Sequence, residues 1–232
     1  MAATLAAEQP EAATPSPEPD SPTEEAAAPS AYGQCANSNA KTVAYIKEAN
    51  VWLWVQGSQS LALTDSGDVV DLKISADGCR VAYSRQLPNP NYDPNAEGFS
   101  GDSYTELWVV SSDGSGNQAL VSWDFLSGLP AADAETTLSV HRYQWQPGSH
   151  TLAVGTRAVT FGLALNDDIH LVDANGAAIN TLLPAGQGGQ FYFSPDGSRI
   201  AFSTPESINV LNSDGSDQQL ELVTFPMVII YW

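Results

Sequence analysis

The sequence predicts an all-β chain made of repeated four-stranded units, and three observations support this prediction. Apolar runs rich in Val, Ile, Tyr, Phe and Trp recur along the chain, separated by Asp-Gly, Asn-Gly and Gly-Ser turns. No segment keeps a helical period of about 3.6 residues. Two kinds of turn also alternate at regular spacing, which indicates that one structural unit is repeated.

The first kind of turn joins the first two strands of a unit. It occurs as ISADG at 74–78, WQPGS at 145–149 and FSPDG at 193–197, and each copy leads into a similar apolar strand. Proline at the second turn position presets φ, and the glycine takes a left-handed conformation that costs another residue about 1–2 kcal/mol. The turn aspartates are therefore expected to hydrogen-bond their own backbone rather than to bind ligands. Asp77 and Asp196 lie in this kind of turn, and the same is expected of Asp113 and Asp214 in the second kind of turn.

The second kind of turn closes the other half of each unit, after the third strand. It occurs as VQG at 55–57, SDG at 112–114, ANG at 174–176 and SDG at 213–215. The distance from Gly57 to Gly78 is 21 residues, and the distance from Gly176 to Gly197 is again 21. A four-stranded unit that recurs at about 40–50 residues is typical of a β-propeller blade.

The best copies of the repeat resemble a known family. SPDGSRIAF followed by INVLNSDG is similar to the TolB-like propeller repeat, and SADGCRVAY and WQPGSHTLAV are weaker copies. TolB-like propellers are extracytoplasmic relatives of WD-repeat propellers. The resemblance covers about residues 42–232. It implies the fold rather than an activity, because the motif residues form turns.

The strand pattern predicts about four blades. Residues 42–63 supply strands two to four of one blade; 68–121, 139–183 and 189–223 are complete blades; and 227–232 form the first strand of another. This last strand could close a ring of four with the incomplete blade, or the chain could be the front part of a larger propeller. We favour the larger propeller, because four blades is the low end for this fold. A stop codon after Trp232 would contradict that reading.

The N-terminal region differs in composition from the rest. Residues 1–32, rich in Ala, Pro and Glu, are expected to be a disordered linker or tail, and residues 33–232 the propeller. The first residues have neither the basic nor the apolar region expected of an intact signal peptide, and the sequence holds no apolar run long enough to span a membrane. The tail and the family resemblance together favour an extracytoplasmic location, either periplasmic, secreted or tethered to the envelope.

The charge distribution argues against nucleic acid as a partner. The net charge is −19, and the eight basic residues are scattered singly. We expect a monomer that binds a protein or a cell-envelope component.

The longest connections predict where that partner binds. Residues 86–104, 122–138 and 158–167 all connect strands at the end of the blades opposite the tight turns, so they share one face. We call this face the loop face. The candidate binding residues on it and at the mouth of the channel are Tyr92, Asp93, Asp102, Tyr104, Trp123, Asp124, Phe125, His141, Arg142 and Phe161. Alternatively, the aromatic residues only pack their own loops.

Catalytic and metal-binding patterns find little support. No G-x-S-x-G elbow is present, and His141, His150 and His170 fall at unrelated positions of the repeat. Asp93 begins a calcium-like alternation of acids, but its twelfth position is Tyr104, where a bidentate acid belongs. We expect no enzymatic activity, no cofactor and no metal.

The sequence holds two cysteines, Cys35 and Cys79. In an exported protein they could form a disulfide, worth roughly 3–4 kcal/mol for a loop of this length. Two free thiols are the alternative.

Two functions remain after these exclusions. The first is a non-enzymatic binding scaffold that acts through the loop face. The second comes from propellers of similar sequence that precede the hydrolase domain of prolyl-oligopeptidase-like serine peptidases. In that case the catalytic domain would be missing from this chain.

Overall fold

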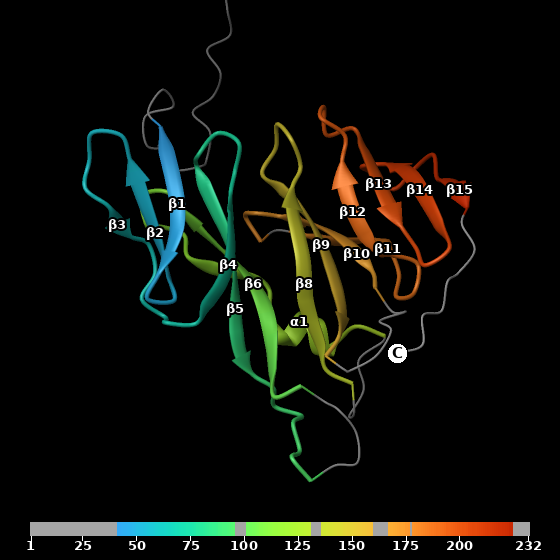
Figure 1. The fold of residues 1–232 in the computed structure, drawn as a ribbon, viewed down its shortest axis with the longest axis horizontal. Helices are drawn as coiled ribbons and strands as arrows, with labels where there is room; N and C mark the ends of the chain where they lie inside the picture. The colour runs from blue at the N-terminus through green and yellow to red at the C-terminus, as the bar shows by residue number, and fades with distance from the viewer. Residues whose placement is uncertain (1–40, 96–100, 131–135, 160–166, 177, 225–232) are drawn as a thin grey trace, which may run out of the picture. The chain divides into compact units, whose positions relative to one another are not determined.

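The computed structural model describes residues 41–95, 101–130, 136–159, 167–176 and 178–224. They form four antiparallel sheets that follow one another along the chain (Figure 1). In every sheet, each strand pairs with the strand next to it in sequence. Within the described residues, no helix has the length and apolar character needed to cross a membrane.

The strand bounds match the predicted blades. The first sheet holds β1 (Thr42–Lys47), β2 (Asn50–Val55) and β3 (Leu61–Ala62); the second holds β4 (Val69–Ile74), β5 (Arg80–Pro88), β6 (Ser103–Ser111) and β7 (Gln118–Val121). The third holds β8 (Leu138–Trp145), β9 (Thr151–Ala158), β10 (Ile169–Asp173) and β11 (Ile179–Leu183); the fourth holds β12 (Gln190–Phe193), β13 (Arg199–Ser203), β14 (Ser207–Asn212) and β15 (Gln219–Thr224). The three complete blades and the three-stranded first blade are confirmed. The N-terminal tail and the strand expected at 227–232 lie outside the described residues.

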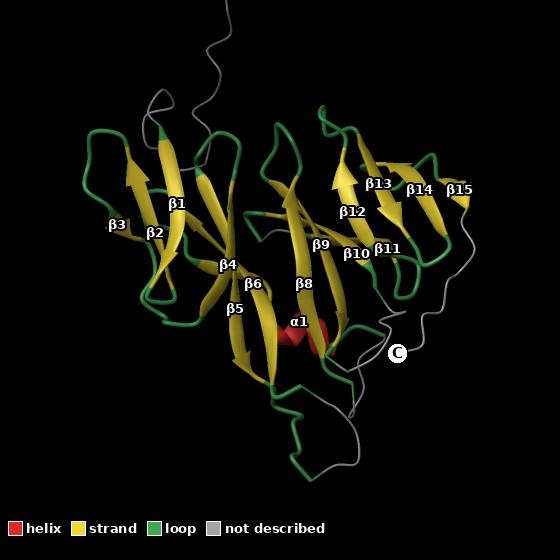
Figure 2. Ribbon diagram, in the orientation of Figure 1, coloured by secondary structure: helices red, strands yellow, loops and turns green. Residues whose placement is uncertain are grey.

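One element escaped the sequence analysis. A short helix, α1 (Trp123–Ser127), follows β7 in the connection to the third sheet (Figure 2). Five residues make little more than one helical turn, which is too short to produce a detectable 3.6-residue period.

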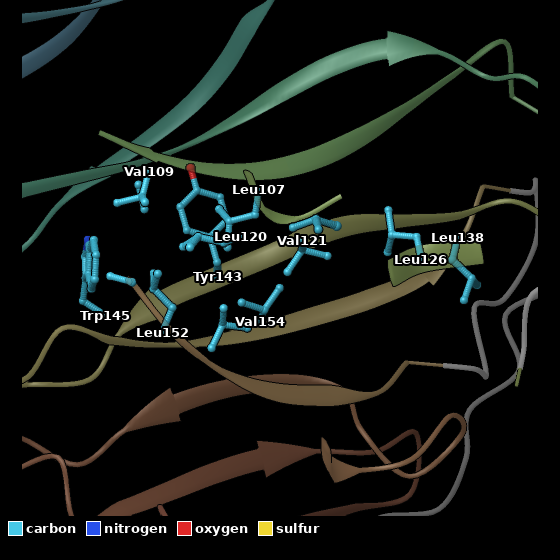
Figure 3. Packing of buried hydrophobic residues seen from close by; sticks show 14 of the residues in the cluster. Leu107, Val109, Leu120, Val121, Leu126, Leu138, Tyr143, Trp145, Leu152 and Val154 are labelled. Carbon is cyan, nitrogen blue, oxygen red and sulfur yellow. The ribbon is translucent and has the colours of Figure 1, made fainter. Parts of the chain in front are cut away.

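The sheets pack face to face, and each interface is an apolar cluster. The largest cluster joins the second and third sheets and includes Leu107, Val109, Tyr143, Trp145 and Leu152 (Figure 3). A second cluster joins the first and second sheets around Val51 and Tyr83, and a third joins the third and fourth around Phe191 and Ile200. The apolar strand residues are therefore buried on both faces of the second and third sheets.

The turn aspartates act as predicted. In FSPDGSR, the hydroxyl of Ser194 donates to Oδ1 of Asp196 at 2.5 Å, and the same oxygen accepts the backbone N–H of Ser198 at 3.1 Å. The network repeats in ISADGCR, where Ser75 donates to Asp77 at 2.6 Å and the N–H of Cys79 donates to the same carboxylate at 3.0 Å. The hydrogen bonds from Ser194, first, and from Ser198 lower the pKa of the exposed Asp196 to about 2. These turns hold the strand register through local bonds.

One turn also touches its neighbouring blade. Gly197 has φ +72°, and a Cβ built on it would lie 2.7 Å from the carbonyl oxygen of Pro147 in the turn of the third sheet. The side-chain amide of Gln146 donates to the carbonyl of Gly197 at 2.9 Å. Glycine is therefore required here both for its conformation and for the close approach of two turns.

This double requirement predicts the outcome of a matched pair of substitutions. Gly57 also has positive φ, but a Cβ on it would meet nothing within 4 Å. We expect Gly57→Ala to cost about 1–2 kcal/mol from backbone strain alone. Gly197→Ala should cost more because it adds the clash with Pro147. Denaturant unfolding of both variants measures the difference, and equal losses would contradict the proposed contact.

Cys79 is disulfide-bonded. The other cysteine of the sequence, Cys35, lies outside the described residues, so the pairing of Cys35 with Cys79 stays a prediction.

We expect titration of the denatured, unreduced protein to find no free thiol, and Cys35→Ser/Cys79→Ser to lower stability by roughly 3–4 kcal/mol. Two titratable thiols without reductant would exclude the bond.

Candidate functional site

The ends of the three long connections meet, as the sequence predicted. The backbone N–H of Gly101 donates to the carbonyl of Val159 at 3.2 Å, and the N–H of Val159 donates to the carbonyl of Thr137 at 2.7 Å. The side chain of Asn89 donates to the carbonyl of Gly101 at 2.7 Å and accepts from the hydroxyl of Thr137 at 2.8 Å. Asn89 and Thr137 are buried. The loop face is therefore bonded together at its base across two sheets.

Three of the aromatic residues predicted to bind a partner pack mainly against other residues of the protein. Tyr104 is buried and meets Trp123 edge to face, with ring centroids 5.1 Å apart. Phe125 packs edge to face on His170 at 5.3 Å. Trp123 and Phe125 both lie partly buried against the largest apolar cluster. These aromatic residues thus hold α1 against the second and third sheets.

A buried carboxylate organises this packing. Glu106 accepts the hydroxyl of Tyr104 at 3.1 Å, the indole N–H of Trp108 at 2.8 Å and the backbone N–H of Trp123 at 2.8 Å. Burial and the charge of Glu106 raise the pKa of Tyr104 above its usual range. Glu106 was missed in the sequence because it occupies an ordinary strand position. The clue available was an acid within an apolar run.

Other predicted residues remain on the surface. Tyr92 is 45% exposed, and Asp93, Asp102 and Asp124 are exposed as well. Asp93 accepts the backbone N–H of Asn95 at 2.8 Å, which makes it a turn-forming residue. Phe161 lies outside the described residues.

The second and third sheets also enclose a polar cavity of about 710 Å³ beside the loop face. Its lining includes Asp71, Ser84, Thr105, Tyr143 and Arg157, together with the predicted His141. A smaller cavity of about 350 Å³ adjoins it and is lined by Asp71, Lys73, His141, Arg142, Tyr143, Gln144 and Tyr192. Because the two cavities share Asp71, His141 and Tyr143, we treat them as one feature and call it the inner groove.

His141 is uncharged at neutral pH in this groove. Burial, with a further contribution from the guanidinium of Arg157, lowers its pKa from the usual 6.5 to about 4. Its Nε2 lies 3.6 Å from Oδ2 of Asp167, whose own carboxyl pKa is raised by burial. The Nδ1 of His141 and the Oδ1 of Asp167 are buried and have no hydrogen-bond partner among the described residues.

Tyr143 brings a further unsatisfied group to the groove. Its side chain is only 3% exposed, and burial, with a contribution from Asp71, raises the pKa of its hydroxyl well above the usual range. That hydroxyl feels the charge of Asp71 but has no hydrogen-bond partner among the described residues. In Figure 3 the Tyr143 oxygen points away from the centre of the apolar cluster. The groove therefore offers polar atoms that a ligand could satisfy.

The other two histidines serve the structure. His170 is buried beside Asp168, which accepts the backbone N–H of Thr156 at 2.8 Å. Its Nε2 lies 2.9 Å from Asp168 without the alignment of a hydrogen bond, and its Nδ1 lies 3.0 Å from the hydroxyl of Thr181.

His150 lies in a turn, with Nε2 2.8 Å from Oδ2 of Asp77. Together with Cys79 these two residues form a cluster of possible metal ligands. The disulfide takes the Cys79 sulfur out of that set, since a thiolate is the ligand form.

Comparisons with known proteins establish the fold. No family model and no curated protein matches the sequence. Dipeptidyl peptidase 4 of Porphyromonas gingivalis is similar in structure, with a TM-score of 0.56 and 15% identity over 77% of this chain and 30% of that chain. An oligogalacturonate lyase in complex with manganese has a TM-score of 0.55 and 11% identity over 80% of this chain and 50% of that chain.

Both of these enzymes contain propeller domains. The chain has a β-propeller fold. It spans 30% and 50% of the lengths of the two enzymes, and at these identities the similarity shows the fold alone. Membership of the TolB-like family stays a prediction.

The pKa of His141 predicts a pH-dependent stability difference. A histidine whose folded pKa lies below its unfolded value of about 6.5 stabilises the fold above that pH, and the contribution is lost as pH falls toward about 4. We expect the free energy of unfolding of the native protein to fall by up to about 3 kcal/mol more than that of His141→Gln between pH 7 and pH 4. Urea unfolding across this range measures it, and parallel curves would contradict a buried neutral His141.

The contacts of Glu106 predict a second loss of stability. The Glu106 carboxylate accepts hydrogen bonds from three donors, and in Glu106→Gln the side-chain N–H₂ group would face at least one of them. We therefore expect the free energy of unfolding to fall by about 1–3 kcal/mol. The matched control is Glu206→Gln at an exposed position, which should change stability by less than about 0.5 kcal/mol. Thermal unfolding of both variants tests this, and similar effects would show that the Glu106 contacts contribute little.

Proposed function

We propose that the chain is a non-enzymatic, extracytoplasmic binding scaffold of TolB-like type that recognises a protein or envelope component through its loop face. The observation that supports this best is the hydrogen-bonded base of that face, where Asn89, Thr137 and Val159 join connections from two sheets. Variable loops on a rigid scaffold commonly carry binding, and loops fixed before binding lose less conformational entropy when a partner docks.

The chemistry of the exposed residues fits such a partner. Tyr92 offers a half-exposed aromatic ring, and Asp93, Asp102 and Asp124 in the long connections offer exposed carboxylates. Tyrosine is enriched in protein interfaces, and the acids favour a partner with a basic or hydrogen-bond-donating surface. Tyr104, Trp123 and Phe125 support the face from beneath.

A second candidate function rests on the structural similarity to dipeptidyl peptidase 4. The chain would then be the propeller part of a prolyl-oligopeptidase-like serine peptidase. A coding sequence after Trp232 that contains G-x-S-x-G on a strand-turn-helix would favour this candidate. A stop codon at that point would exclude it.

Site-specific crosslinking tests the binding proposal. A photoreactive phenylalanine analogue at Tyr92 should crosslink one defined component of an envelope extract, because Tyr92 lies on the loop face. The matched control places the same analogue at the exposed Gln56 in a tight turn at the opposite end of the blades. Capture from both positions, or from neither, would contradict recognition through the loop face.

A further inference from the structure

The basic residues of this acidic chain are unevenly placed. Three of its eight lysines and arginines, Lys73, Arg142 and Arg157, line the inner groove. They come from β4, β8 and β9, so they are brought together by the packing of the second sheet on the third. Among the described residues that line the two cavities, Asp71 is the only acid, so these residues carry a net charge of +2 in a chain of −19.

None of these three cations forms an ion pair with a carboxylate of the described residues, although Arg157 acts on Asp167 from a greater distance. Among the described residues, ion pairs with arginine join Arg85 to Asp68 and Arg199 to Asp217. No described carboxylate lies within 4.0 Å of the side-chain nitrogens of Lys73, Arg142 or Arg157. The chain has 27 acidic residues, so the absence of ion pairs at these three cations does not come from a shortage of acids. Cations left unpaired in a recess attract anions, because low-dielectric walls focus their field.

Arg142 is held in place for such a contact. Its Nε donates to the backbone carbonyl of Phe191 at 3.2 Å, and its guanidinium lies 4.4 Å from the ring centre of Tyr192. The stacking leaves the two terminal nitrogens without a hydrogen bond to any described residue. A planar, fixed guanidinium with free terminal N–H groups matches a carboxylate in a two-point contact.

Two neighbouring side chains add to this arrangement. The ammonium of Lys73 lies 5.5 Å from the ring centre of Tyr143, whose buried hydroxyl is one of the unsatisfied polar atoms of the groove. The hydroxyl is a donor for a second ligand oxygen. His141 adds a hydrogen-bonding nitrogen without a charge, and Asp167 and Asp168 are acids close to it.

We infer that the inner groove binds a ligand through its carboxylate groups. Carboxylates fit better than phosphates, because Asp71 in the lining repels a phosphate group with two negative charges more strongly than a single carboxylate group of a ligand. The donors are also guanidinium and phenol side chains rather than a set of backbone N–H groups at a helix N-terminus. This site is separate from the partner proposed for the loop face and does not depend on it.

Isothermal titration of the full chain at low ionic strength tests the inference with three probes: citrate, tetraglutamate and inorganic phosphate. We expect a carboxylate probe to bind in a salt-sensitive manner and phosphate to bind at least tenfold more weakly. Binding of citrate alone would identify a small polycarboxylate as the ligand class, and binding of tetraglutamate alone an acidic peptide. Binding of neither, or equal binding of phosphate, would overturn the inference.

Variants locate the binding in the groove. Arg142→Gln and the exposed Arg157→Gln should each weaken the carboxylate probe about tenfold, as expected for a charged contact worth about 1.4 kcal/mol. Arg199→Gln, at a basic residue outside the groove, is the matched control and should leave affinity unchanged. Arg157→Gln removes no structural hydrogen bond of the described residues, so it stays informative if Arg142→Gln does not fold. Equal affinities for the Arg157 and Arg199 variants would overturn the assignment to this groove.

The two proposals can fail separately. Loss of crosslinking at Tyr92 while the carboxylate probe still binds would refute the loop-face proposal alone.

Discussion

The packing of sheet on sheet is the constraint on which the rest of this structure depends. In β9, Leu152 and Val154 belong to the cluster shared with the second sheet, whereas Ala153 between them belongs to the cluster shared with the fourth. In β5, Ala82 faces the third sheet, and Val81 and Tyr83 face the first. A strand buried on both sides must be apolar at consecutive positions, and a slip of one residue would exchange its two interfaces.

That packing also creates the features with functional potential. The loop face is held together because the connections next to β5, β6, β8 and β9 meet, where buried Asn89 and Thr137 bond across two sheets. The inner groove exists because the second and third sheets bring polar side chains opposite one another beside the apolar cluster. The packing of one sheet on the next thus forms both the apolar core and the polar inner groove.

The fold could be predicted from sequence because its signals are local. The Ser194–Asp196 and Ser75–Asp77 bonds span two residues, so the turn motifs fixed the phase of every blade. The site was predicted less completely. His141 and Arg142 were found, but Lys73 and Arg157 lie on other strands and join them only through sheet packing. Tyr104 and Trp123 had the composition of exposed loop aromatics, and the contact with buried Glu106 that draws them inward could not be read from their spacing.

The pairing of each strand only with its neighbours in sequence has a consequence for how such chains change over time. No hydrogen-bond ladder runs from one sheet to another among the described strands, so a duplication or deletion of one whole unit would leave every remaining ladder intact. Only the two apolar surfaces that meet at the new junction would have to match. Growth and shortening in steps of one unit are therefore open to this architecture, while the loops of each unit can diverge separately.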